Sequence, residues 1–485
     1  MSDPRLPTLE GEELEPFFTA CRAGATYRAA LEQLLVELPL ERAELLMQRL
    51  REGRAAFVTL TDGASGRALL VGDALSGSAL ALGRAGFELT VIDSDPRRLA
   101  LARERDRSIG GGRVRFVRAD PRAPLPFATE SFAVAVDERG APTRGELAEL
   151  ARVTREELLV VADNRLAYKL SSGVRADFRV VGPLGLLRRA AQPPHGERSL
   201  RGWRRCLTDV GLSWTEGYAL YPHRFDFSHV VALDGPLPTL TVGPKERANK
   251  LKLAARSAGL FPLFTPSFAL RAGRGPRPGR WIDGALRRVS TDLRTSAPTV
   301  EHLIATRGNT CVFLTDGPRW CVHLPLSPAQ ERQSRRHFEA LRLLEDEHPS
   351  FPSPRALWSG EIDGRYLCVE RRLDGLSAAQ LTGDLPATAR TYRELALALA
   401  LLVTRGPGTL DEDDLARTVD RRLAVTAPRA ACSGTGRALE EIAERLRERL
   451  AAWQLPLVLH HSDLRAKHVQ VASDGSLIGL MDFGS

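Results

Sequence analysis

The chain has 485 residues, a length that predicts two to three domains, each able to bury a hydrophobic core. Its composition, 43% hydrophobic and 26% charged, is that of a globular protein. The formal charge of +8 comes mostly from arginine and suits anionic ligands such as nucleotides. No dense Lys/Arg run with interleaved aromatic residues occurs, so we expect no nucleic-acid partner.

The cysteines and the apolar runs indicate the cellular compartment of the protein. The six cysteines are scattered without a Cys-x-x-Cys pair, which indicates neither a zinc site nor a disulfide framework. Residues 1–15 lack the pattern of a signal peptide, and the longest clean apolar run, Leu395–Val403, has nine residues. A membrane span needs about 20. We therefore expect a cytoplasmic protein without a membrane partner, and the oligomeric state stays open.

The N-terminal segment is predicted to be helical. Between residues 13 and 53, leucines recur at helical spacing, at positions 31, 34, 35 and 38 and again at 45, 46 and 50. This pattern predicts a helical cap over residues 1–60, ahead of the first strand.

A β-α-β unit is predicted next, over residues 68–105. Residues 68–71 and 87–92 are the apolar strand runs, and a loop of small residues with Gly72, Asp73 and Gly77 follows the first one. Small residues let the backbone approach a nucleotide-like ligand, and Asp93, at the end of the second strand, could accept hydrogen bonds from ribose hydroxyls. Asp93 could equally belong to a helix entry, because Asp95 and Pro96 follow it.

Further strands are predicted at 114–119, 132–136 and 157–162, and the first of them is followed by Asp120. This order resembles the class I S-adenosylmethionine-dependent methyltransferase fold over residues 61–275, with Ser267–Arg271 similar to its terminal antiparallel strand. The resemblance implies that Gly72, Asp73 and Gly77 cradle the methionine end of the cofactor. It also implies that Asp93 binds the ribose and that Asp120 lies beside the adenine.

The sequence departs from this family at several positions. The usual leading acid of the glycine loop is Leu70, only two of its glycines remain, and the frequent acid of the fourth strand is Ala133. A Rossmann-like domain that has lost its ligand therefore stays open. Residues 202–212 are predicted as an amphipathic helix. Tyr221 and His223 could line an acceptor pocket, but an aromatic cluster more often belongs to the core.

A linker is predicted over residues 276–297, because residues 271–280 are rich in Gly, Pro and Arg and have no hydrophobic period. Strands then follow at 304–314 and 319–324, the first interrupted by the turn Gly308-Asn309-Thr310. Ser327 and Pro328 open a helix predicted to end near residue 346, and residues 366–374 form another apolar strand. Helices are predicted at 391–404 and 436–453.

The last 26 residues carry the clearest motif. His461-Ser462-Asp463 opens this stretch and Asp482-Phe483-Gly484 closes it, and between them the runs 468–472 and 477–481 flank a turn signal. A hairpin of this length brings the two aspartates to the same end of a strand pair. Phosphoryl transfer needs one carboxylate to orient the attacking hydroxyl and another to hold the magnesium on the phosphates.

This pattern resembles the aminoglycoside-phosphotransferase branch of the protein-kinase-like fold, with an N-lobe at 298–375 and a C-lobe at 376–485. The resemblance implies that Asp463 orients the acceptor and that Arg465 neutralises the transferred phosphate. It implies that Asp482 and His468, which stands at the family's asparagine position, bind the metal. Further roles implied by the resemblance are a phosphate loop at Gly308 and Asn309, a phosphate grip by His323 paired with Glu339, and adenine contacts around Glu370.

His323 stands where the family has a lysine, so Arg319 on the same strand face could supply the cation instead, or His323 is a core histidine. The chain also ends directly after Asp-Phe-Gly, where family members continue, and we therefore expect a truncated sequence or an incomplete C-lobe.

Taken together, the sequence predicts α/β plus α+β architecture, a Rossmann-like methyltransferase domain followed by a two-lobed kinase-like domain. The predicted function is a two-module transferase that uses S-adenosylmethionine, ATP and Mg²⁺ and acts on a small-molecule hydroxyl. Two alternatives remain open: a degenerate pseudoenzyme with a nucleotide-binding or regulatory role, and a chain in which only the methyltransferase-like module is active.

Overall fold

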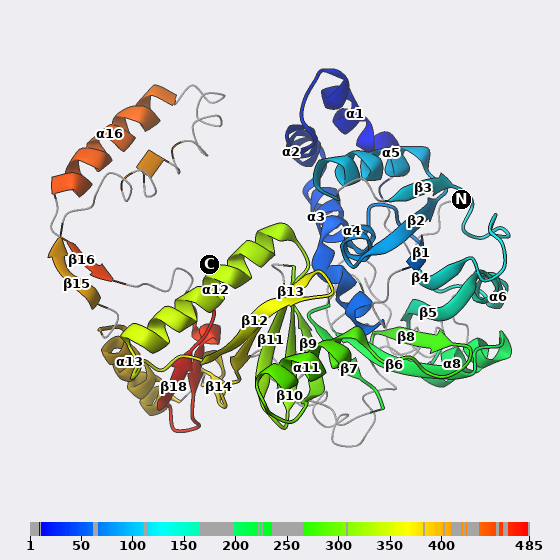
Figure 1. The fold of residues 1–485 in the computed structure, drawn as a ribbon. Coiled ribbons are helices and arrows are strands. Elements are labelled where there is room, and N and C mark those ends of the chain that lie inside the picture. Colours follow the sequence, from blue (N-terminus) through cyan, green and yellow to red (C-terminus); the bar gives the residue numbers. More distant parts are fainter. Residues whose placement is uncertain are drawn as a thin grey trace. The chain divides into compact units, whose positions relative to one another are not determined.

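The computed structural model describes residues 9, 11–61, 66–110, 114–164, 198–221, 224, 227–234, 265–306, 309–381, 384–400, 403–408, 415, 419–420, 423, 436–452, 455–458 and 464–483. Figure 1 shows the fold as a ribbon coloured along the sequence. Contacts divide the chain into two compact units. The first comprises Met1–Phe338 and Ala356–Arg372, and the second comprises Glu339–Arg355 and Leu373–Ser485. Within the described part of the chain, none of the helices combines the length and apolar character needed to cross a membrane.

The predicted N-terminal helices are present in the first unit. They are η1 (Gly11–Leu14), α1 (Glu15–Arg22), α2 (Tyr27–Glu37), α3 (Leu40–Leu50) and the 3₁₀ segment η2 (Glu52–Leu60). Helix α2 begins at Thr26, whose hydroxyl accepts a hydrogen bond from the Ala29 amide at 3.3 Å. Leu34, Leu46 and Phe57 are buried in the core of this unit, which explains the leucine spacing.

A parallel sheet forms from the predicted strands, now bounded as β1 (Gly66–Val71), β2 (Phe87–Asp93), β3 (Arg115–Arg118), β4 (Phe132–Gly140) and β5 (Thr154–Asp163). Their order is β3-β2-β1-β4-β5, with every neighbouring pair parallel. Strand β8 (Ser267–Gly273) pairs antiparallel with β5 and with β6 (Trp214–Tyr221). The predicted antiparallel terminal strand is therefore confirmed.

Both faces of this sheet are buried. Alternate residues such as Leu70 and Val91 enter one hydrophobic cluster, while Leu69 and Ile92 enter another. The first face contacts α4 (Gly77–Arg84) and α5 (Pro96–Arg105), and the second carries α6 (Arg144–Val153) and α8 (Leu200–Asp209), as Figure 1 allows the reader to follow. The chain is thus a mixed α/β protein with a doubly wound sheet, and the predicted fold class is confirmed.

The sheet continues beyond β6 within the same unit. Strand β7 (His229–Ala232) pairs antiparallel with both β6 and β9 (Thr299–Ala305). Beyond β9 the order is β10 (Thr310–Asp316), β11 (Trp320–Pro325), β13 (Arg365–Arg371) and β12 (Ala356–Ile362), all antiparallel, in a sheet of 13 described strands.

The linker prediction for residues 276–297 is wrong over most of that range. Helix α11 (Trp281–Asp292) occupies it, and its residues Trp281, Ile282 and Leu286 are buried with Leu303 and Phe313 in one core cluster. The Trp281 amide also donates to the Thr61 carbonyl at 3.0 Å. The preceding residues are rich in Gly, Pro and Arg, and the apolar face of α11 is short. The sequence pattern therefore did not indicate a helix here.

Helix α12 (Pro328–Glu347) follows β11 and begins as predicted, with the Gln330 amide donating to the Ser327 hydroxyl at 3.4 Å. Its residues Ser334, His337 and Phe338 lie against β13, where the Cys368 thiol donates to the Ser334 carbonyl and Phe338 packs with Tyr366. One face of the β11–β13 strands therefore meets α12, and the other, with Val322 and Val369, faces the core that contains α11.

The second unit contains the predicted C-terminal hairpin. Strands β17 (Val469–Val471) and β18 (Leu477–Leu480) pair antiparallel, and β14 (Leu376–Ser377) adds to β17. Helix α13 (Leu385–Ala400) begins before residue 391, and β15 (Val403–Gly408) follows it and pairs with β16 (Leu455–Val458). The predicted helix 391–404 therefore began and ended too late in the sequence. Among the described residues, this unit also contains α16 (Gly436–Ala452) and the 3₁₀ turns η5 (Ala378–Gln380) and η7 (Ala466–His468).

Candidate functional site

The C-terminal hairpin brings together the two residues predicted to bind metal. His468 ends η7 and is buried, and Asp482 lies two residues after β18. Their side chains approach to 3.5 Å between His468 Nε2 and Asp482 Oδ2, while the Met481 amide donates to the His468 carbonyl at 2.9 Å. The hairpin register therefore places an imidazole and a carboxylate side by side.

Asp482 has an unusual backbone conformation, with φ at +69°. Residues other than glycine rarely adopt this left-handed region, and such outliers concentrate at functional sites. The Asp482 side chain is 50% exposed, so its carboxylate can meet a ligand from solvent. Asp482 is thus an exposed carboxylate on a backbone held in the left-handed region.

The hairpin is held by neighbours from its own unit. Arg390 on α13 pairs with Asp474 in the turn at 2.7 Å, and the Thr391 hydroxyl donates to the Gly475 carbonyl at 2.8 Å. At the other end, Phe351 and Phe483 stack edge to face with 6.0 Å between ring centroids. Both ends of the hairpin are therefore anchored, and one of the anchoring residues, Phe483, directly follows Asp482.

The catalytic residues predicted before the hairpin are only partly described. Arg465 is exposed directly before η7, and its carbonyl accepts the His468 amide at 2.8 Å. Asp463 lies outside the described residues, as do His461 and Gly484.

The predicted phosphate loop makes contacts within the first unit. Gly308 lies outside the described residues. Asn309 has φ at +59°, and its side-chain Oδ1 accepts a hydrogen bond from the Gly53 amide at 2.9 Å. Its own amide donates to the Thr306 carbonyl. The Asn309 side chain thus anchors the turn to the N-terminal segment, which differs from the predicted role of covering phosphates.

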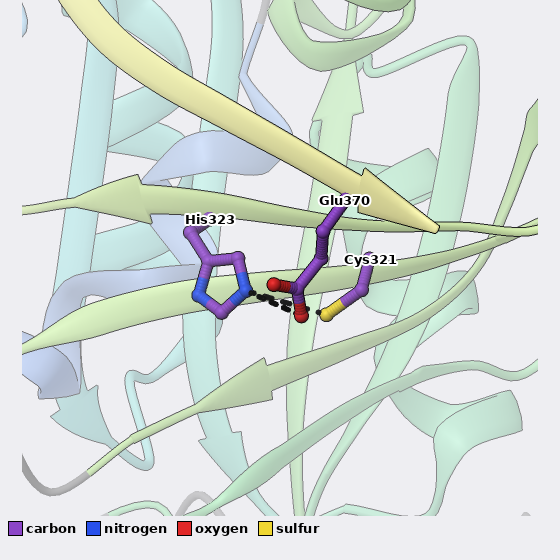
Figure 2. A group of neighbouring side chains, drawn as sticks. All are labelled: Cys321, His323 and Glu370. Atoms are coloured by element: carbon purple, nitrogen blue, oxygen red, sulfur yellow. Dashed lines mark hydrogen bonds and ion pairs between the residues drawn. The ribbon is translucent and has the colours of Figure 1, made fainter. Parts of the chain in front are cut away.

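His323 has a different partner from the one predicted. Its Nε2 lies 3.2 Å from Glu370 Oε1 and 3.5 Å from Cys321 Sγ, so the pairing with Glu339 is wrong (Figure 2). Glu339 is exposed on α12. The register explains the outcome, because Cys321 on β11 is the cross-strand partner of Glu370 on β13 and His323 lies two residues along the same face.

A second histidine completes this cluster. His337 on α12 approaches the other oxygen of the carboxylate, with 2.8 Å between His337 Nε2 and Glu370 Oε2. Burial alone would lower the pKa of His323, but the interactions with Cys321 and Glu370 reverse this and raise the pKa well above its usual value. Burial would raise the pKa of Glu370, yet His323 and His337 hold that pKa well below its usual value. The Glu370 side chain is therefore a buried anion between two imidazoles.

Sequence reasoning missed Cys321 and His337. The alternation Cys321-Val322-His323 on a strand was a readable signal that two ligating side chains share a face. The position of His337 opposite them depends on how α12 crosses the sheet, which no local pattern gives.

The glycine loop after β1 is packed against the chain itself. A Cβ on Gly77 would lie 2.1 Å from the Arg51 carbonyl oxygen and 2.7 Å from the Glu52 Cα. Asp73 is buried and pairs with Arg49 at 3.6 Å between Oδ2 and Nε. The segment 49–52 therefore fills the space beside this loop that the resemblance assigned to the methionine end of the cofactor.

Gly72, at the end of β1, adopts φ at +154°, and a Cβ there would lie 3.1 Å from the Glu138 Cβ. Glu138 was missed by sequence reasoning. It is buried, its Oε1 accepts a hydrogen bond from the Ser78 hydroxyl, and its Oε2 has no hydrogen-bond partner among the described residues. A ligand at this edge of the sheet could donate a hydrogen bond to this oxygen.

Asp93 is occupied by protein groups. Arg98 grips both of its oxygens, with 3.0 Å from Nε to Oδ2 and 2.6 Å from Nη2 to Oδ1. The Ala74 amide donates to Oδ2 and the Asp95 amide to Oδ1. Burial raises the pKa of the Asp93 carboxyl despite the opposing hydrogen bond and charge of Arg98. The N-cap of the following helix, α5, is Asp95, and Pro96 is the first helical residue. The Asp95 carboxylate accepts a hydrogen bond from the Arg97 amide.

Asp120, predicted beside the adenine, is exposed after β3 and accepts a hydrogen bond from the Arg122 amide at 2.9 Å. Of the aromatic cluster, Tyr221 ends β6, whereas His223 lies outside the described residues. The carboxylates of Asp93 and Asp120 thus differ sharply: one is buried and paired, and the other is free to meet solvent.

Comparisons with known proteins support the C-terminal assignment. Residues 303–485 match the model of the Phosphotransferase enzyme family, which confirms the predicted resemblance for this part of the chain and its enzyme class, a transferase. A comparison with curated proteins found no match.

Solved structures with some likeness include WbdD, at 13% identity over 89% of this chain and 73% of that chain, with a TM-score of 0.27. Another is phosphoethanolamine N-methyltransferase 2 of Haemonchus contortus, at 13% identity over 44% and 50% of the two chains, with a TM-score of 0.28. A third is geranyl diphosphate C-methyltransferase of Streptomyces coelicolor, at 13% identity over 51% and 84%, with a TM-score of 0.27.

Proposed function

We propose that the C-terminal module of this two-module chain transfers a phosphoryl group from ATP to the hydroxyl of a small molecule. The observation that carries this proposal is the approach of His468 and Asp482 to 3.5 Å at the end of an anchored hairpin. The match of residues 303–485 to a phosphotransferase family supports the same chemistry.

The residues at the hairpin fit a divalent cation. The Asp482 carboxylate supplies the hard oxygen ligand that Mg²⁺ requires, whereas the His468 imidazole is a ligand that Mn²⁺ accepts more readily. A metal held there would bridge the ATP phosphates and neutralise charge as the phosphoryl group moves. We assign Asp463 the task of orienting the acceptor hydroxyl, and exposed Arg465 that of neutralising the transferred group.

His323 is not assigned to the phosphates in this proposal. Its Nε2 faces the Glu370 carboxylate at 3.2 Å, and this anion balances the imidazolium charge that a phosphate would otherwise meet. The ATP phosphates must then rely on the metal and on other cations.

Titration of ATP in the presence of Mn²⁺ or Mg²⁺ tests the proposal on the full chain. Asp482→Asn should weaken metal-dependent ATP binding at least about tenfold, because it removes a charged ligand. Asp474→Asn is the matched control, since Asp474 lies in the turn of the same hairpin and pairs with Arg390. Equal binding by wild type and Asp482→Asn would refute the metal assignment.

For the N-terminal module, specific contacts favour a second candidate role, that of a scaffold. The residues expected to hold S-adenosylmethionine do not fit it: Asp93 is saturated by Arg98 and two amides, and Gly77 is packed against residues 51–52. Among the features described above, two groups stay available: the buried Glu138 Oε2, which has no hydrogen-bond partner among the described residues, and the exposed Asp120 carboxylate. We therefore propose no methyl transfer by this module.

Thermal unfolding of the full chain with S-adenosylmethionine separates the two roles of this module. A scaffold should show no increase in Tm with the cofactor. A Tm that rises with its concentration would restore the methyltransferase function.

A further inference from the structure

Three side chains from two neighbouring strands converge on one point in the first unit. Cys321 and His323 come from β11 and Glu370 comes from β13, and Figure 2 shows them directed toward one another. The sulfur, the imidazole nitrogen and a carboxylate oxygen all lie within 4.8 Å of one another. No residue of this set is used for phosphoryl transfer in the proposed function.

The two contacts to His323 converge on one atom. Cys321 Sγ and Glu370 Oε1 both approach the same ring nitrogen, His323 Nε2, at 3.5 Å and 3.2 Å. That nitrogen carries at most one proton and cannot donate well to both atoms. In a nucleophilic Cys-His-acid triad the thiol and the acid would instead lie at opposite nitrogens of the ring.

The separations match those around a metal ion. Tetrahedral zinc binds sulfur at about 2.3 Å and nitrogen or oxygen at about 2.0–2.1 Å, which places sulfur and nitrogen ligands about 3.6 Å apart and nitrogen and oxygen ligands about 3.4 Å apart. The observed distances, 3.5 Å and 3.2 Å, agree with both values. Sulfur, imidazole and carboxylate together form a ligand set that zinc accepts.

The surroundings suit a metal centre as well. His337 Nε2 lies 2.8 Å from the second oxygen of Glu370, the kind of outer contact that fixes a ligating carboxylate. The neighbouring thiol of Cys368 donates to the Ser334 carbonyl at 3.9 Å. The His323 side chain is 20% exposed, which leaves a route for an ion and a fourth position for water.

We propose that Cys321, His323 and Glu370 bind one zinc ion, with His337 positioning the carboxylate and a water molecule completing the tetrahedron. Binding releases the thiol proton of Cys321 and a proton from the His323 imidazolium to solvent, since zinc takes thiolate and neutral imidazole. The ion clamps β11 to β13. The site escapes a search for Cys-x-x-Cys pairs because its ligands come from two strands that a helix separates in the sequence.

Cobalt substitution tests this site in the full chain. After treatment with a chelator, the protein is titrated with Co²⁺ alone, and absorption is recorded in the near-ultraviolet and visible ranges. We expect the first equivalent of Co²⁺ to produce a thiolate-to-cobalt charge-transfer band and the visible bands of a tetrahedral ion. Added Zn²⁺ should remove both.

The variants identify the ligands. Cys321→Ser should abolish the charge-transfer band, and Glu370→Gln should weaken Co²⁺ binding at least about tenfold. Cys21→Ser is the matched control, because Cys21 is another partly exposed cysteine of the same unit, and it should leave the band unchanged. Asp482→Asn should also leave it unchanged, which separates this site from the metal of the proposed phosphoryl transfer.

Two results would overturn the proposal. One is a wild-type spectrum without a thiolate band at one equivalent of Co²⁺, a measurement that does not depend on any variant folding. The other is a band that survives in Cys321→Ser, since the metal would then sit on a different cysteine.

Discussion

Asp93 illustrates how one residue can satisfy a sequence pattern and still serve a different purpose. A carboxylate at the end of the second strand predicts a ribose contact, and the strand end is where the structure places it. The Arg98 side chain, five residues later, donates hydrogen bonds to both carboxylate oxygens. The pattern gives the position of the acid, but the partner depends on the rotamer of a nearby arginine.

Arg98→Met tests whether this ion pair is structural. Asp93 is fully buried, so removal of its cation should cost about 3–5 kcal/mol in the free energy of unfolding, measured by urea denaturation near pH 7. Arg97→Met is the control, because Arg97 is more exposed and meets Glu15 only at 3.6 Å. Its loss should stay within about 0.5 kcal/mol. Equal effects of the two variants would show that the Asp93 pair is dispensable.

The His323 cluster gives the same lesson. The sequence predicted His323 on the correct strand, but Glu339 was predicted as its partner only because the family carries a glutamate on the following helix. The true partner, Glu370, is selected by the register of β11 and β13, which sets Cys321 opposite Glu370. Cross-strand register between segments about 50 residues apart lies beyond local patterns.

At the scale of elements, the C-terminal hairpin was the most predictable piece. Two β-prone runs and a Ser-Asp-Gly-Ser turn predicted β17 and β18, and Gly475 takes the positive φ of +82° that such a turn requires. The β-α-β strands were equally readable, because long apolar runs between loop signals are strong evidence. Helix α11 was missed because residues rich in Gly, Pro and Arg precede it.

The two glycines of α4 provide a matched test of what the glycine loop is for. Gly77→Ala places a Cβ against the backbone of residues 51–52, which cannot yield cheaply, and should cost about 1–3 kcal/mol of stability. In the same helix, a Cβ on Gly83 would be 3.7 Å from its nearest neighbour, Val114. Gly83→Ala should therefore stabilise the protein by up to about 1 kcal/mol.

Urea denaturation of the two variants gives the comparison. A neutral Gly77→Ala would mean that residues 51–52 do not press on this loop, and the space beside it would be available to a ligand. A glycine pattern alone cannot distinguish the close approach of a cofactor from the close approach of the chain itself.

For the molecule as a whole, the pairing of β7 with β9 joins the sheet formed by β1–β8 to the strands β9–β13 that follow in the sequence. His229 and His302 meet there, stacked with 4.9 Å between ring centroids and 3.0 Å between Nδ1 and Nε2. Burial lowers the pKa of His229 to about 4. Burial, reinforced by His229 and Arg372, lowers the pKa of His302 to about 3. Both rings are therefore neutral in the folded protein at neutral pH.

These two histidines should make the protein less stable in mild acid. Below the unfolded pKa of 6.5 the unfolded chain takes up protons that the folded chain refuses until about pH 4, so stability falls as pH falls through this window. Between pH 7 and pH 5 the loss should reach about 3–4 kcal/mol for the pair.

Urea denaturation at both pH values, compared with the double variant His229→Gln/His302→Gln, isolates this contribution. Burial raises the pKa values of Asp93 and Glu52, but their effects are common to both proteins and cancel in the comparison. The double variant should lose less stability on acidification than the wild type. The same loss in both proteins would contradict the neutral pair.

The continuity of the sheet was itself beyond sequence reasoning. Several strands were predicted from their own residues, but β7 was not, and its pairing with β9 joins segments that local rules assign to separate domains. Long-range pairing is fixed by packing in the whole unit, here by the core cluster shared between Val230, Leu303 and α11.

The central claim, that the C-terminal module transfers phosphoryl groups, is tested most directly by ATP turnover. The full chain is incubated with ATP and either Mg²⁺ or Mn²⁺, and release of the γ-phosphate is followed with water as the default acceptor. We predict metal-dependent turnover that Asp463→Ala lowers at least about 100-fold, while Asp474→Asn leaves it unchanged. Absence of turnover with either metal, or an undiminished rate in Asp463→Ala, would contradict the account.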